Sequence, residues 1–166
     1  MSRGLEDLKY NLSDIFNYLD SKYCINSGGC CYVALVLAGE LERLNIKYQL
    51  VIYNDKDINS RTRKLPIRRA IKNRDLHQTI GIGKNVCIHY AIATPELGVL
   101  NPDDCDKDPY LKSISLATIN SSDIEWIYKT GDWNRCYNTK FNKIVRDCIH
   151  LAFKGYEIRK ENEQED

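Results

Sequence analysis

The sequence contains no apolar run long enough to cross a membrane, and no apolar segment follows a basic start. Its first 20 residues instead show the pattern of an amphipathic helix. We therefore predict a soluble, cytoplasmic protein without membrane contact. Charges are nearly balanced, since 24 Lys and Arg against 23 Asp and Glu give a net charge of +1. The chain as a whole thus has no strong attraction for nucleic acid.

Several motifs with defined chemistry are also missing. The seven cysteines are an odd number without Cys-x-x-Cys spacing, which argues against a disulfide framework and a zinc knuckle. The segment Gly81-Ile-Gly83-Lys84 lacks the remaining residues of phosphate-loop and dinucleotide-binding patterns. Hydrophobic residues make up 43% of the chain, which excludes a disordered class. We predict one domain over residues 1–158, a disordered charged tail over 159–166, and no cofactor.

The stretch 26–45 joins a polar turn to an apolar helix. An Asn-Ser-Gly-Gly turn leads into Cys30 and Cys31, and an apolar run from Val33 to Ala38 follows. This pattern predicts a buried helix that begins near Cys30. A helix N-terminus carries partial positive charge, so a cysteine there loses its proton more easily. Cys30 is therefore a candidate nucleophile, with Cys31 as the alternative.

A second informative stretch contains the histidine of the candidate site. Period-two alternation over residues 86–93 predicts a strand with His89 and Ala91 on the same face. A turn follows, and the chain returns as a partner strand that ends at Asn101. If Ala91 pairs with Val99, His89 faces Asn101; a register two residues longer places Asp103 there instead. Either side chain would orient the imidazole as the third member of a catalytic set.

Two further hypotheses concern the binding of a polyanion and of a metal ion. Seven basic residues lie between Arg61 and Arg74. They predict either a contact with nucleic acid or another polyanion, or a solvated face that nearby aspartates offset, and we favour the solvated face. A metal site made by Cys87, His89 and Cys105 is disfavoured, because strand residues two apart need further ligands that no spacing identifies.

Together these residues resemble the papain-like superfamily of thiol enzymes, particularly its transglutaminase-like branch. The resemblance covers residues 26–103 and rests on order and spacing. It consists of Gly28 and Cys30 at a helix start, Ala34 four places on, Leu44-Asn45-Ile46 at the helix end, His89 on a strand, and Asn101-Pro102 ending the next strand. Two residues depart from that branch, since Asn45 stands where it has glycine and Asn101 where it has aspartate.

The resemblance implies an α+β fold with a papain-like core, in which a central helix carrying the cysteine packs on an antiparallel sheet between flanking N- and C-terminal helices. It implies Cys30 as nucleophile, His89 as general base and then acid, and Asn101 as orienter. The Cys30 N–H and the Asn26 side chain would hold the oxyanion. The expected activity is that of a cysteine peptidase or amidase on a protein or peptide substrate, through an acyl-enzyme. Transfer or deamidation at glutamine, and a non-catalytic binding module on the same fold, are the alternatives.

Overall fold

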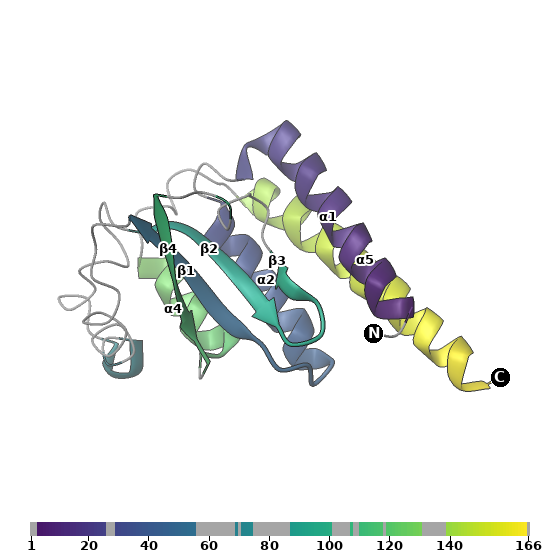
Figure 1. Ribbon diagram of the computed structural model, residues 1–166. Helices are drawn as coiled ribbons and strands as arrows, with labels where there is room; N and C mark the ends of the chain where they lie inside the picture. The colour runs from purple at the N-terminus through teal and green to yellow at the C-terminus, as the bar shows by residue number, and fades with distance from the viewer. Residues whose placement is uncertain are drawn as a thin grey trace.

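The computed structural model describes residues 3–25, 29–55, 69, 71–74, 87–100, 107, 110–117, 119–130 and 139–165. They form helices and strands in the order α1 (Arg3–Tyr23), α2 (Cys30–Arg43), β1 (Gln49–Asp55), β2 (Cys87–Thr94), β3 (Gly98–Leu100), β4 (Leu111–Leu116), α4 (Ser121–Thr130) and α5 (Thr139–Glu165). The described part combines helices with one antiparallel sheet, in agreement with the predicted α+β class (Figure 1). None of its helices is both long and apolar enough to cross a membrane.

The sheet has the strand order β3-β2-β1-β4, so β2 and β1 lie at its centre. The pairing of β1 with β2 places Gln49 opposite Ala93 and Tyr53 opposite His89. Just beyond this pair the register shifts, because Asn54 pairs with Cys87 rather than with Ile88. This irregularity lies at the start of β2, directly before His89, and irregularities of this kind bend a strand locally.

The two faces of the sheet have different surroundings. One face contributes Leu50, Ile52, Tyr90 and Ile92 to the main hydrophobic core, which α2 covers with Leu37 and Leu41 among others. The opposite face holds a smaller cluster of Val51, Tyr53 and Ala91. Behind α2, the helices α4 and α5 pack against it, and α1 packs against α5 (Figure 1). The layer of helices therefore lies on one side of the sheet.

The end of α2 sets the direction of the strands that follow. Asn45 has a left-handed backbone, with φ of 56°, and its N–H donates to the Glu42 carbonyl while the Ile46 N–H donates to the Leu41 carbonyl. This is a Schellman cap, for which glycine or asparagine is favoured. The chain then reverses into β1, and β2 reverses again, so β2 runs in the same direction as α2 (Figure 1).

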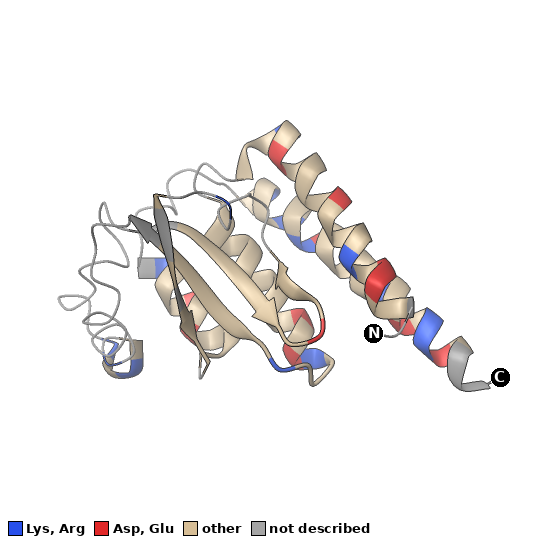
Figure 2. Ribbon diagram, in the orientation of Figure 1, with Lys and Arg blue, Asp and Glu red and all other residues tan. Residues whose placement is uncertain are grey.

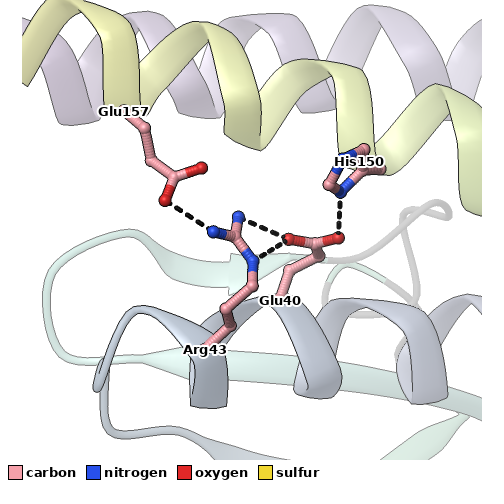
Figure 3. Close-up of polar contacts among 4 residues, drawn as sticks. All are labelled: Glu40, Arg43, His150 and Glu157. Carbon is pink, nitrogen blue, oxygen red and sulfur yellow. Dashed lines mark hydrogen bonds and ion pairs between the residues drawn. The ribbon is translucent and has the colours of Figure 1, made fainter.

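A network of charged side chains joins α5 to α2. Arg43 of α2 contacts Glu40 at 2.7 Å and Glu157 of α5 at 2.5 Å, and His150 Nδ1 lies 2.7 Å from the second oxygen of Glu40 (Figure 3). The Arg43 guanidinium holds the pKa of Glu157 below its ordinary value. The network therefore fixes the C-terminal helix against the helix that carries the candidate nucleophile.

The predicted disordered tail differs from the structure. Helix α5 continues through this stretch to Glu165, and Arg159 forms an ion pair with Asp7 of α1. Lys, Arg, Glu and Gln are favourable helix residues, so a segment that is too polar to form a core of its own can still extend an existing helix. Composition alone shows only the lack of apolar residues and does not indicate this continuation of the helix.

Candidate functional site

Cys30 is the first residue of α2, as the change from polar turn to apolar run predicts. The Val33 N–H donates to the Gly29 carbonyl at 3.1 Å and closes the first turn of the helix. Both cysteines are buried, with 6% of the Cys30 residue exposed and none of Cys31. A reagent or substrate can therefore reach Cys30 more readily, which favours it over Cys31 as the nucleophile.

The first turn of α2 has no carboxylate that would offset the helix dipole, since Cys30 is followed by Cys31, Tyr32 and Val33. The partial positive charge of the helix N-terminus is available to a thiolate or to an oxyanion. The chain enters this turn tightly, because the Gly29 N–H donates to the Ile25 carbonyl at 2.7 Å. The local backbone thus places the thiol at the electropositive end of a 14-residue helix.

His89 lies near the start of β2 and is only 1% exposed. Its ring contacts that of Tyr53, its partner on β1, with centroids 6.0 Å apart and planes tilted by 48°. No local pattern in the sequence singles out Tyr53. Alternation along β1 places Tyr53 on the same face as Val51, but its contact with His89 depends on the register of two strands that are more than 30 positions apart.

The topology brings Cys30 and His89 to the same end of the fold. Because α2 and β2 run in the same direction and pack together, their N-terminal ends lie at one side of the helix and sheet layers (Figure 1). The side chains have different surroundings, however. Cys30 belongs to the core between the helices and the sheet, whereas His89 lies on the opposite face with Tyr53.

The register of β3 distinguishes the two candidates for the third residue. Ile92 pairs with Leu100 and Ala93 with Val99, so the pairing of Ala91 with Val99 is wrong and the longer register is present. If this ladder is extended, Asp103 rather than Asn101 falls opposite His89. Asn101, Asp103 and the proposed oxyanion donor Asn26 lie outside the described residues.

No protein-family model, curated protein or solved structure matches the chain. Its function has to be inferred from its own residues.

Aromatic rings surround the first turns of α2. Tyr32 of α2 contacts Tyr128 of α4, with ring centroids 5.2 Å apart, and burial raises the pKa of Tyr32 above its ordinary value. The Tyr128 hydroxyl accepts a hydrogen bond from the Asn142 amide at 3.0 Å. Next to Gly29, the Phe141 ring approaches the backbone. These side chains make a largely apolar wall around the helix that carries Cys30.

The basic segment is described only in part. Arg74 forms an ion pair with Asp123 at 2.9 Å and lies over the Trp126 ring, 5.4 Å from its centroid. This cation therefore contacts α4 through both an ion pair and a ring. Arg69 and Lys72 are exposed, and the remaining basic residues from Arg61 onward lie outside the described residues.

In the part of the chain that the structure describes, no three His, Cys, Asp or Glu side chains lie close enough together to hold a metal ion. Of the disfavoured set, Cys105 and the side chain of Cys87 lie outside that part. Among the cysteine side chains that the structure describes, Cys30 and Cys31 are buried, Cys148 is half-buried and Cys24 is exposed.

Proposed function

We propose that the chain is a cysteine-dependent acyl-transfer enzyme, with Cys30 as the nucleophile and His89 as the general base. The observation that supports this most is the position of Cys30 as the first residue of α2, a helix that packs against the strand carrying His89. Thiolate activation needs an electropositive site and a base nearby. The papain-like arrangement of a central helix on an antiparallel sheet is part of this proposal.

The proposed reaction follows from these roles. His89 takes the proton of the Cys30 thiol, and the thiolate attacks the carbonyl carbon of a peptide or amide bond. Backbone N–H groups at the start of α2 stabilise the oxyanion of the tetrahedral intermediate. The amine leaves with the proton from His89, and an acyl-enzyme remains. Water activated by His89 then releases the acid; capture by an amine, or attack on a glutamine side chain, is the alternative outcome.

For the third residue, the observed register favours Asp103 over Asn101. A carboxylate opposite His89 would hold the imidazole in one orientation and stabilise its protonated form. This arrangement would be that of the transglutaminase-like branch, in which an aspartate occupies the role. The test is to compare Asp103→Asn with Asn101→Asp: the first is expected to slow acyl transfer and the second to leave it nearly unchanged.

A non-catalytic binding module on the same fold is the second candidate. The observation that favours it is the location of His89 on the sheet face that holds Tyr53 and Ala91, away from the face that α2 covers. In such a module Cys30 is an inert core residue, and the basic segment from Arg61 to Arg74 contacts a polyanion. Its binding would weaken steeply with added salt. Protein or peptide partners remain the preferred class, and nucleic acid is not favoured.

An activated ester separates the two candidates without knowledge of the natural substrate. The protein is mixed with p-nitrophenyl acetate, the release of nitrophenolate is followed, and the acetylated residue is located by mass spectrometry. We expect one rapid acetylation at Cys30, abolished in Cys30→Ala and slowed in His89→Gln. Cys148→Ser, which removes a half-buried thiol from α5, serves as the matched control. This variant should still show the rapid acetylation at Cys30.

The outcomes of this experiment are distinct. Acetylation of Cys31 moves the nucleophile by one position and leaves the mechanism intact. No rapid acetylation of either residue in the folded protein contradicts the enzyme proposal and favours the binding module.

A further inference from the structure

The first and last helices form an antiparallel pair. Asp7 of α1 pairs with Arg159 of α5, and at the other end Tyr23 contacts Phe141 with ring centroids 5.8 Å apart. The pair lies beside the layers of sheet and helices and extends away from them (Figure 1). One face of the pair joins the core, and the other faces outward.

The outward face contains an open groove between the two helices. Its volume is about 590 Å³, and it is lined by Ile15 and Asp14 of α1 and by Leu151, Lys154, Gly155 and Ile158 of α5. Leu151 is 69% exposed and Ile158, seven residues further along the same helix face, is 50% exposed. Large apolar side chains that line a groove between helices in this way are typical of a surface that another helix covers.

The charges at the groove are arranged asymmetrically. Asp14 lies on the α1 side, and Lys154 lies on the α5 side with Arg159. Figure 2 shows both signs of charge along this pair of helices, whereas the described strands carry almost none. Since Asp7 of α1 is level with Arg159, Asp14 is level with residue 152, and Lys154 lies only about 3 Å further along the helix axis.

From this arrangement we infer that the groove is the interface of a homodimer. A twofold axis parallel to the helices would place α1 of each copy over α5 of the other, because rotation about such an axis exchanges the two sides of the groove. Asp14 of one copy then meets Lys154 of the other, twice in each dimer. A twofold axis across the helices would instead bring like charges together. The four helices form an antiparallel bundle.

The available area is sufficient for such a dimer. With 21 residues, α1 is about 32 Å long, and two packed helices are about 20 Å wide. Each copy would therefore bury about 600 Å² and the dimer about 1,200 Å², which exceeds the roughly 1,000 Å² expected of a specific interface. Leu151 and Ile158 would supply its apolar centre.

Sedimentation equilibrium over a range of concentrations tests the inference. We expect the parent chain to be a dimer and Leu151→Glu to be a folded monomer, since the exposed Leu151 side chain contributes little to the fold. Tyr110→Glu is the matched control, because Tyr110 is 75% exposed and directly precedes β4, at the edge of the sheet opposite β3, the strand that contacts α1. This variant should remain a dimer. Far-ultraviolet circular dichroism checks that each variant is folded.

Charge reversal tests the proposed geometry. Asp14→Lys and Lys154→Asp should each weaken the dimer about tenfold, because every contact occurs twice. The double variant Asp14→Lys/Lys154→Asp should restore it. A parent chain that stays monomeric at every concentration overturns the inference and leaves the groove to another occupant. If Leu151→Glu still dimerises as the parent does, the groove is not the interface. The same holds if the double variant dimerises no more tightly than the two single variants.

Discussion

Gly29 is the position at which the smallest change should disturb the candidate site. It precedes Cys30, and a Cβ atom there would lie 2.9 Å from the Ile25 carbonyl oxygen, 3.2 Å from the Ile25 Cα and 3.3 Å from the Phe141 ring. The ring can move, but the carbonyl also accepts the Gly29 N–H. In Gly29→Ala the turn must therefore open by about half an ångström before contacts become ordinary.

Gly29→Ala should lower the free energy of unfolding by about 1–3 kcal/mol, the range found when an extra methyl group is forced into a packed site. Gly39→Ala is the matched control in the same helix, because a Cβ atom at Gly39 meets nothing within 4 Å. There the substitution should stabilise the protein by about 0.5–1 kcal/mol, since alanine has the higher helix propensity. The two substitutions add the same methyl group and are expected to change the free energy of unfolding in opposite directions.

Urea unfolding followed by circular dichroism measures both effects. Gly29→Ala should lower the unfolding midpoint without changing the m-value, and Gly39→Ala should raise it. Because Cys30 follows the displaced turn, Gly29→Ala should also slow acetylation by the activated ester, whereas Gly39→Ala should not. A Gly29→Ala protein as stable as the parent would refute the assigned turn geometry.

Three further variants test the contacts around α2. Burial by itself raises the pKa of Glu42, but hydrogen bonds from Ser121 and Tyr48 outweigh it and lower that pKa. Glu42→Gln should therefore lower the free energy of unfolding by about 1 kcal/mol near neutral pH. In urea unfolding, this difference should disappear as the pH falls through the lowered pKa. Arg43→Gln should cost less than about 1 kcal/mol, and an NMR titration should show the pKa of Glu157 rising to its ordinary value. At Asn45, glycine should match or exceed the parent in thermal stability, whereas Asn45→Val should cost about 1 kcal/mol or more because of the positive φ.

The helices that surround the site could be predicted from local patterns. Leu8, Leu12 and Leu19 give the buried face of α1, and the break between a Gly-Gly turn and an apolar run marks the start of α2 at Cys30. Both signals lie within a few residues of the feature that they predict.

The register at β3 could not be fixed in this way. It depends on the turn before Gly98, which has φ of 73°, and on the hydrogen bond from the Leu97 N–H to the Thr94 hydroxyl. Both alternatives satisfy the alternation of β2, so the sequence allowed a displacement of two residues. That displacement decides whether Asn101 or Asp103 comes opposite His89.

The surroundings of His89 depend on contacts between distant segments. Alternation correctly placed it with Ala91, but only the packing of α2 on the opposite face of the sheet shows that the face of Ala91 is the one away from α2. Both faces of β1 and β2 hold buried apolar residues, so alternation within each strand does not decide which face a helix covers. A direct measurement of how His89 acts on the Cys30 thiol therefore tests the proposal most sharply.

That measurement is the pH dependence of alkylation by iodoacetamide, with each modified cysteine located by mass spectrometry in the parent and in His89→Ala. The exposed thiol of Cys24 provides an internal comparison. A thiolate and imidazole pair predicts fast labelling of Cys30 well below the ordinary thiol pKa of ~8.5, and its loss in His89→Ala. If Cys30 in the folded parent is labelled no faster than Cys24 at every pH, and His89→Ala changes nothing, the thiolate and imidazole pair does not exist.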